Sequence, residues 1–254
     1  MRFVLVHGGF HGAWCWERTI PAIERLGHEA IAIDLPGNGT RRDEIPTVAS
    51  RRDAVLAVLR DGDVLVGHSG GGFEITTAAD AAPEKVGHLI YLAAGLPREG
   101  RTTMEANGGA SREGDAATQL MSDDTGMLRF IRPDERGWMR WVDRDEGRDF
   151  FYHDCSSEVV DRAFERLTPA PTEFIQEPIS VPNFWKADLP RSYIRCEQDR
   201  AKPHWMSEDV VRRLGVVPLT IDTSHSPFFS RPDDLARLLV EATRTKPIGP
   251  LLPD

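Results

Sequence analysis

Short apolar runs alternate along this chain with longer amphipathic stretches, and this rhythm limits the fold more than any other feature. In the first 95 residues the apolar runs are 3–6, 30–33, 64–66 and 89–93, with helices expected between them at 14–26, 48–59 and 71–82. Continuous apolar strands separated by helical spacing are typical of a parallel sheet covered by helices on both faces. We therefore expect an α/β fold.

The rhythm stops near residue 96 and resumes near residue 190. After that point we expect strands over 192–196 and 217–221 and helices over 206–214 and 235–242. The polar, loop-rich block between them holds ten of the twenty aromatic residues, from Phe130 to Trp185. We predict a core domain made of residues 1–95 and 190–254, and a helical cap of residues 96–189 inserted between two strands of one sheet.

Composition excludes several kinds of partner. Lys and Arg total 31 against 40 Asp and Glu, a formal charge of −9, which argues against nucleic acid or an anionic membrane surface. No apolar run approaches the ~20 residues of a membrane span, and no signal-peptide pattern precedes the first strand.

The cysteines, Cys15, Cys155 and Cys196, lack metal-binding spacing and suggest reduced thiols. We expect a cytoplasmic protein with a small-molecule substrate, no metal and no cofactor; a homodimer is left open.

The residues from Gly67 to Gly71 read G-x-S-x-G and stand between an apolar run and an expected helix. A nucleophile elbow needs this context, because its sharp turn lifts the serine hydroxyl above the sheet and leaves no room for side chains two places away. The alternative is a glycine-rich turn that cradles phosphate. No Walker lysine follows Gly72 and no G-x-G-x-x-G is present, so Ser69 is the predicted nucleophile.

A serine nucleophile needs a general base, and the base needs an orienting acid. In this architecture they follow later strands in the order serine, acid, histidine. Of eight histidines, His225 is the one that follows the last expected strand, whereas His7 and His68 are expected to hold loop geometry. Asp199 follows the run 192–196 and is the predicted acid, with Glu197 as its nearest rival.

The charge that develops on the substrate oxygen needs two donors. The first is expected from the backbone N–H of Gly70, directly after the nucleophile. The second is expected from the loop after the first strand, where we favour the Gly9 N–H over that of Phe10. A glycine at this place lets the backbone approach the substrate.

These residues resemble the α/β-hydrolase fold and, within it, the branch of plant methylesterases, hydroxynitrile lyases and their bacterial esterase relatives. The matching segments are 3–14, 67–71 and 197–199, together with His225. They occur in the family's order, and the block 96–189 falls where the family carries its cap. The resemblance implies Ser69 as nucleophile, His225 as base and Asp199 as acid. It also implies oxyanion donors at Gly9 and Gly70.

Two positions depart from the lyases of this branch. Those enzymes carry a Lys directly after the catalytic His and a Thr after the first-strand His, where this chain has Ser226 and Gly8. Without that ammonium, cyanohydrin cleavage loses its electrostatic support. We therefore predict a serine esterase that cleaves a methyl, aryl or alkyl ester or a lactone through an acyl-enzyme. A lyase or carbon–carbon hydrolase with the same triad, or a ligand-binding protein of low turnover, stays open.

Aromatic residues near the expected site favour a small apolar or aromatic substrate over a sugar or a phosphate. We predict substrate contacts for Phe10, Phe228, Trp138 and Tyr152. The alternative is that these rings pack the cap and never touch substrate.

Overall fold

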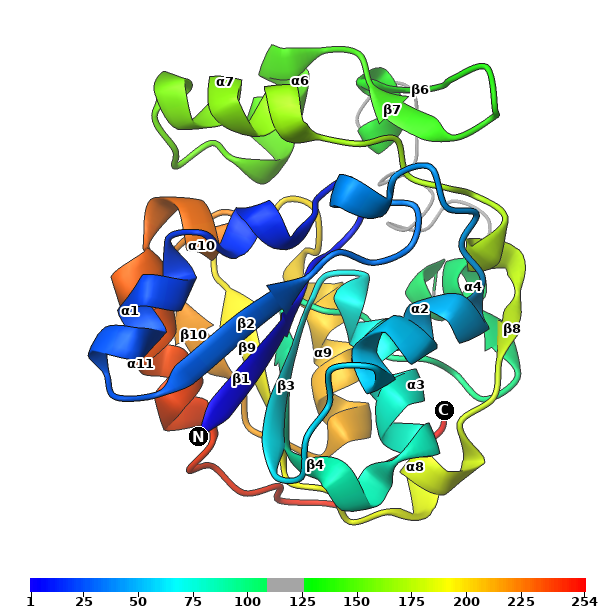
Figure 1. Ribbon diagram of the computed structural model, residues 1–254, viewed down its shortest axis with the longest axis vertical. Helices are drawn as coiled ribbons and strands as arrows, with labels where there is room; N and C mark the ends of the chain where they lie inside the picture. The colour runs from blue at the N-terminus through cyan, green and yellow to red at the C-terminus, as the bar shows by residue number, and fades with distance from the viewer. Residues whose placement is uncertain (109–125) are drawn as a thin grey trace.

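The computed structural model describes residues 1–108 and 126–254, and its centre is one parallel sheet (Figure 1). The strand order is β10-β9-β4-β3-β1-β2, and every neighbouring pair is parallel. The strands are β1 (Arg2–Val6), β2 (Glu29–Ile33), β3 (Asp63–His68), β4 (Val86–Leu92), β9 (Arg191–Cys196) and β10 (Leu219–Ile221). The predicted α/β fold is confirmed.

Helices cover both faces of this sheet, because its central strands are apolar on both sides. Alternate residues of β1 serve two cores: Phe3 and Leu5 pack in one, Val4 and Val6 in the other. The helices of the first face are α1 (Thr19–Arg25), α10 (Pro227–Ser230) and α11 (Pro232–Ala242). Those of the second face are α2 (Val48–Leu56), α3 (Gly71–Ala81), α8 (Pro182–Lys186) and α9 (His204–Leu214).

Two prolines move element boundaries away from the sequence prediction. The helix expected over 14–26 is a 3₁₀ turn, η1 (Ala13–Trp16), followed by α1. Pro21 lacks an N–H and its ring would clash with the carbonyl four residues earlier, so one continuous helix cannot form. The strand expected over 217–221 starts at Leu219, since Pro218 cannot donate to the ladder.

The segment between β4 and β9 divides into two parts. Its protruding part contains β6 (Ile131–Pro133), β7 (Met139–Trp141), α6 (Arg144–Phe151) and α7 (Ser157–Arg166), seen at the top of Figure 1. The rest runs along the main body and includes α4 (Thr103–Gly108) and the pair β5 (Arg101–Thr102) with β8 (Pro178–Ile179). Phe130, Trp141 and Phe151 of the protruding part join the same apolar core as Phe228 of α10.

The register of the sheet brings the loops of the predicted site to one edge. Val6 at the end of β1 pairs with Gly67 near the end of β3. Ile221 at the end of β10 pairs with Cys196 at the end of β9. The segments that follow these four strands therefore emerge together at the carboxyl edge of the sheet, beneath the protruding part.

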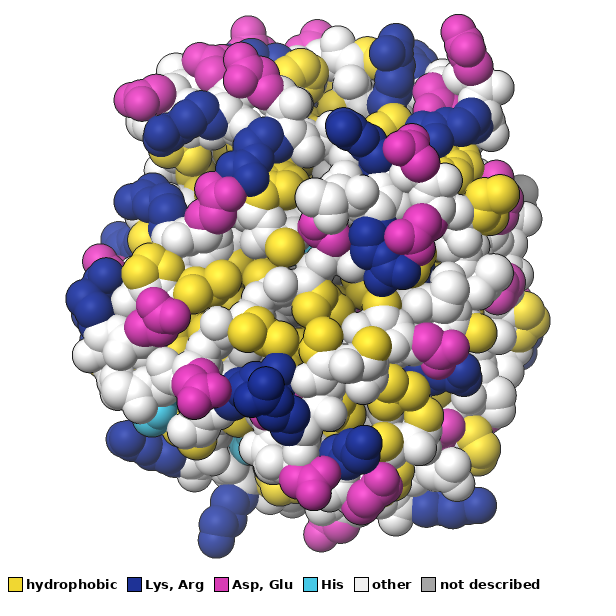
Figure 2. Space-filling view, in the orientation of Figure 1, with side chains coloured by type: hydrophobic (Ala, Val, Ile, Leu, Met, Phe, Trp, Pro, Cys, Tyr) yellow, Lys and Arg dark blue, Asp and Glu magenta, His cyan; other side chains and the backbone are white. Residues whose placement is uncertain are grey.

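One face of the molecule is shown in space-filling form in Figure 2. Apolar side chains gather near its middle, around the edge strand β2, whose residues Ala30 to Ile33 are half-buried. Acidic and basic side chains are interspersed over the rest of this face. Among the residues described, no helix combines the length and apolar character that crossing a membrane requires.

Candidate active site

Ser69 stands in the turn from β3 to α3 with a φ of 52°, a left-handed conformation that is costly for a residue with a side chain. A Cβ on Gly67 would lie 2.5 Å from the Gly71 carbonyl oxygen, and one on Gly71 would lie 2.7 Å from the Val6 carbonyl oxygen. The Ser69 N–H donates to the Leu92 carbonyl oxygen at 3.1 Å, which ties the turn to β4. This is the geometry of a nucleophile elbow.

His225 and Asp199 form a buried pair at the ends of β10 and β9. His225 Nδ1 lies 2.7 Å from Asp199 Oδ2, and the two side chains are 2% and 1% exposed. The other carboxylate oxygen, Oδ1, accepts the backbone N–H groups of Ala201 and Lys202 at 2.8 and 2.7 Å. These bonds orient the carboxylate toward Nδ1, which leaves Nε2 of the ring available as a base.

Glu197, the rival acid, is placed elsewhere. Its carboxylate is 36% exposed and lies 3.6 Å from the exposed His204 ring. Among the described residues no hydrogen bond or ion pair joins it to His225, whose Nδ1–H donates to Asp199 instead. The structure therefore brings together the serine, the histidine and the aspartate that the sequence order selected.

Ser69 and His225 line one cavity of about 350 Å³. Its wall is mostly apolar; the larger apolar members are Phe10, Met104, Met127, Phe151, Ile175 and Met206. No hydrogen bond joins the Ser69 hydroxyl to the His225 ring among the described residues, and such bonds often tighten only in the complex with substrate. Within residues 1–108 and 126–254, no group of three or more His, Cys, Asp or Glu side chains is arranged to hold a metal ion.

Gly9 and Gly70 both line this cavity, and their backbones lie close together. A Cβ on Gly70 would be 3.8 Å from the Gly9 nitrogen. In the described part of the chain neither N–H donates to a backbone carbonyl. The N-terminus of α3, which begins at Gly71, adds a positive partial charge beside them. The pair can accept a developing oxyanion from the cavity side.

Three buried histidines hold the loops around the site. His7 Nδ1 donates to the Gly8 carbonyl oxygen at 2.7 Å, and His68 Nε2 donates to the His225 carbonyl oxygen at 2.9 Å. His11 Nδ1 donates to the Gly9 carbonyl oxygen at 2.8 Å. Burial lowers the pKa of His7 to about 3 and that of His11 to about 4, and it lowers the pKa of His68 as well. The predicted loop-holding role of His7 and His68 is confirmed.

Of the four predicted substrate contacts, only Phe10 lines the cavity. The Trp138 indole N–H donates to Glu173 at 3.2 Å, and its ring is buried. The Tyr152 hydroxyl donates to His11 Nε2 at 2.6 Å, and Phe228 is fully buried against Trp16 and His68. These three rings serve packing and loop support, which is the alternative that the sequence left open.

The methionines and the lysine of the cavity wall could not be identified from the sequence. Met104, Met127 and Met206 carry no local pattern that separates a cavity from a core. Lys202 follows the predicted acid by three residues, and a lysine at a loop-helix junction normally indicates a solvent-exposed position. Its nearness to Asp199 in the chain was the one available signal.

Replacing Tyr152 with phenylalanine is expected to destabilise the protein by about 1–3 kcal/mol, because it leaves the buried His11 Nε2 without a donor. Urea unfolding measures the effect. Tyr193→Phe is the matched control: Tyr193 is also fully buried, but its hydroxyl makes only a long bond of 3.4 Å to the Ala94 carbonyl oxygen. Equal losses of unfolding free energy in the two variants would show that the hydrogen bond to His11 stabilises the fold no more than the long bond to Ala94.

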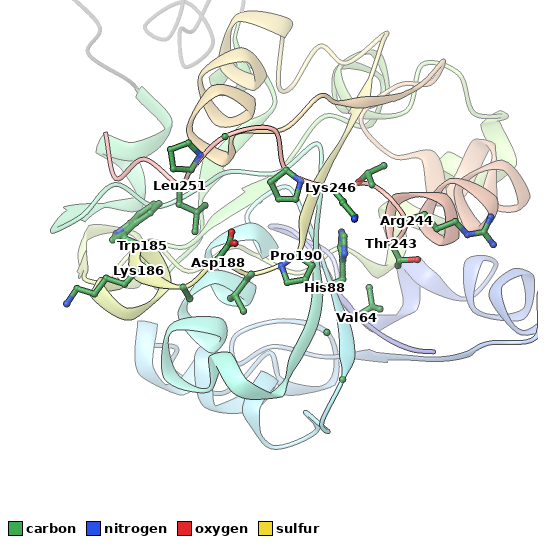
Figure 3. A pocket seen from close by; sticks show the side chains of 18 of the residues that line it. Val64, His88, Trp185, Lys186, Asp188, Pro190, Thr243, Arg244, Lys246 and Leu251 are labelled. Atoms are coloured by element: carbon green, nitrogen blue, oxygen red, sulfur yellow. The ribbon is translucent and has the colours of Figure 1, made fainter.

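A larger hollow of about 960 Å³ lies at the opposite edge of the sheet. Figure 3 shows Val64, His88 and Pro190 from the amino ends of the strands facing Lys246 of the C-terminal segment. Ligands of parallel α/β sheets bind outside the carboxyl ends of the strands. None of the predicted catalytic residues is among the described residues that line this hollow, so the cavity beside Ser69 is the candidate active site.

His88 gives the stability of the fold a measurable pH dependence. Burial lowers the pKa of its ring to about 4, below the ordinary 6.5, while Nε2 is bonded to Ser192 Oγ at 2.9 Å. The unfolded chain therefore binds the extra proton first, and stability is lost as pH falls from 6.5 toward 4. Between pH 7 and 5 the loss of unfolding free energy should be about 2 kcal/mol smaller in His88→Gln than in the wild type. If urea unfolding showed the same loss of unfolding free energy in both proteins between pH 7 and 5, the expectation would be contradicted.

An all-parallel sheet with a serine elbow, a buried His–Asp pair and a cavity at the carboxyl edge is the architecture of the α/β hydrolases. The alpha/beta hydrolase family model matches residues 3–238, and the chain belongs to that family. The resemblance drawn from the sequence is thereby confirmed.

Its relatives place it near the plant methylesterases. Norfluorocurarine synthase 2 from Strychnos sp is 30% identical over 256 residues, covering 95% of this chain and 94% of the relative. Methylesterase 1 from Arabidopsis thaliana is 28% identical over 257 residues, covering 92% of each. The chain spans 57% and 64% of the length of two chloroplastic candidate methylesterases, 15 and 11, from the same plant.

Solved structures share the fold of this chain. Polyneuridine aldehyde esterase superimposes with a TM-score of 0.77 at 24% identity, covering 94% of this chain and 98% of that one. The methylesterase MES16 from Arabidopsis gives a TM-score of 0.71 at 25% identity, covering 95% and 98%. These likenesses concern the fold.

Proposed function

We propose that this chain is a carboxylic ester hydrolase with Ser69 as its nucleophile. The observation that carries the proposal is the cavity lined jointly by Ser69 and by a histidine whose other ring nitrogen is bonded to a buried aspartate. Relatives named as methylesterases and a fold neighbour named as an esterase support it. The mostly apolar wall and the volume of about 350 Å³ suit a small apolar or aromatic ester.

In the first half-reaction the Ser69 Oγ attacks the ester carbonyl carbon while His225 Nε2 takes the hydroxyl proton. The Asp199 carboxylate stays ionised and stabilises the imidazolium through Nδ1. The carbonyl oxygen becomes an oxyanion and accepts the N–H groups of Gly9 and Gly70. Each such donor contributes about 3 kcal/mol in other hydrolases.

The tetrahedral intermediate then collapses. The bond from carbon to the alcohol oxygen breaks, and His225 delivers its proton to that oxygen, so that an alcohol leaves and an acyl-Ser69 ester remains. His225 next takes a proton from water, and the resulting hydroxide attacks the acyl carbon. The acid is released and the Ser69 hydroxyl regains the proton.

The position after the base favours hydrolysis over cyanohydrin cleavage. Ser226 is fully buried, and among the described residues its hydroxyl has no hydrogen-bond partner. It carries no positive charge at the position where the lyases of this branch carry theirs, whereas hydrolysis needs only the triad, the two N–H donors and water.

Two measurements test the proposal. The first is a panel of chromogenic short-chain esters, methyl esters, lactones, cyanohydrins and β-diketones, in which the esters should be turned over fastest. A fluorophosphonate should add one covalent group, located by peptide mass spectrometry on Ser69. Labelling of another residue, or turnover only of cyanohydrins or diketones, would overturn the assignment, and absence of any turnover would favour a ligand-binding protein.

A further inference from the structure

Lys202 lies in the wall of the catalytic cavity. It is 7% exposed, and it shares this cavity with Ser69 and His225. It is the only Lys, Arg, Asp or Glu among the described residues that line this cavity. Burying an unpaired charge costs free energy of folding. A single buried cation in a wall without other charged residues among those described is therefore unusual.

The ammonium of Lys202 has no anionic partner in the described part of the chain. Both oxygens of Asp199 are already bonded, one to the His225 ring and one to backbone N–H groups. Asp209, the other nearby acid, is 33% exposed and pairs with Arg98 and Arg212 at 2.9 and 2.8 Å. Burial lowers the pKa of Lys202 to about 8, and the charges of Asp199 and Asp209 offset this only in part.

The place of Lys202 is fixed relative to the triad. Its own backbone N–H donates to Asp199 Oδ1 at 2.7 Å, and α9 begins two residues later at His204. The base of the side chain is therefore held at a constant position relative to Asp199, which is bonded to His225. A substrate whose ester carbonyl is at Ser69 meets this lysine in the same cavity.

We propose that Lys202 is a specificity residue that pairs with a carboxylate on the substrate, so that the preferred substrates are half esters of dicarboxylic acids. This inference rests on the proposed ester hydrolysis and adds the substrate class. The ester end is attacked at Ser69, the free carboxylate pairs with the Lys202 ammonium, and the apolar spacer packs against Phe10, Met127 and Phe151.

The chemistry of the wall favours a carboxylate over a phosphate. One ammonium balances one negative charge, whereas a phosphate monoester brings about −1.5 to −2 near neutral pH. No Arg lines the described wall to hold the second charge, and arginine is the residue that recognises phosphate by paired hydrogen bonds. The excess charge would be buried without a partner.

The kinetic test compares the monomethyl and dimethyl esters of isophthalic acid. The measured quantity is the ratio of kcat/KM for the half ester to kcat/KM for the neutral diester. Lys202→Met should lower this ratio by about 30-fold or more, mainly through KM, because the carboxylate loses its buried partner. Lys202→Arg should restore most of the ratio since it keeps the charge. Lys186→Met, at an exposed lysine on α8, is the matched control and should leave it unchanged.

A binding test separates this inference from the proposed function. Calorimetry with benzoate and with benzamide, its neutral isostere, should show a preference for benzoate that disappears in Lys202→Met. Met is close to Lys in volume, so the variant is expected to fold, and thermal unfolding checks this. The inference would be overturned if Lys202→Met kept both the kcat/KM ratio and the benzoate preference within about twofold of wild type. This holds even if neutral esters are hydrolysed at Ser69. A Lys202-dependent benzoate preference without any ester turnover would uphold the anion site and refute the esterase.

Discussion

Replacing Ser69 with alanine is expected to lower kcat for a chromogenic short-chain ester by about 10⁶-fold, the loss seen when serine hydrolases lose their nucleophile. The reason is that Ser69 is lifted by the turn at φ 52° into the cavity shared with His225, and no second hydroxyl is carried by that turn. The two oxyanion donors remain, so a small rate above that in water should survive. Stopped-flow and long-time assays of the purified variant measure it.

Ser226→Ala is the matched control for this variant. Ser226 is also a buried serine and directly follows His225, but it stands outside the described lining of the cavity. Its replacement should change kcat no more than a few-fold. A Ser69→Ala protein that retains more than about one per cent of wild-type kcat after removal of contaminating esterases would refute the assignment of the nucleophile.

Replacing Asp199 with asparagine is expected to reduce kcat by about 10⁴-fold, whereas Glu197→Gln should have little effect. An asparagine can keep an oxygen at the Oδ1 position, where two backbone N–H groups donate, but it presents an NH₂ group to His225 Nδ1. The ring must then carry its proton on Nε2, and this tautomer cannot accept the proton of Ser69. The Glu197 carboxylate lies 3.6 Å from the His204 ring and is not placed to compensate.

The comparison of these two variants needs a check on folding. Because the loop bonds to Oδ1 can persist, Asp199→Asn should unfold in urea within about 1 kcal/mol of the wild type. A large fall in kcat with unchanged stability then reports on the tautomer alone. If Glu197→Gln lost more activity than Asp199→Asn, the two residues would exchange roles.

The main sheet could be predicted because its strands are buried on both faces, so each appears as an uninterrupted apolar run. Phe3 to Val6 illustrates this: all four side chains are buried, two in each core. The elbow could be predicted because steric exclusion at Gly67 and Gly71 leaves a local sequence pattern. The gathering of Ser69, Asp199 and His225 at one edge could be predicted because parallel topology sends the carboxyl end of every strand to that edge, so that residues far apart in the chain come close together.

The cavity wall could not be predicted in the same way. Its residues come from loops and short helices whose positions depend on tertiary contacts, and an aromatic residue gives no sign of which neighbour it meets. Tyr152 was expected at the substrate and is instead bonded to His11, while Phe151, one residue earlier, lines the cavity. Element boundaries were similarly displaced wherever a proline removed a donor, as at Pro21 and Pro218.

The main-chain bonds to Asp199 Oδ1 have an evolutionary consequence. Amides at positions 201 and 202 exist whatever side chains those positions carry, with proline as the single exception. Mutational drift at Ala201 and Lys202 can therefore diversify ligand preference while the Asp199 carboxylate keeps its orientation. Randomised libraries at these two codons should yield many folded, active clones with altered selectivity, and proline should be the residue that selection removes.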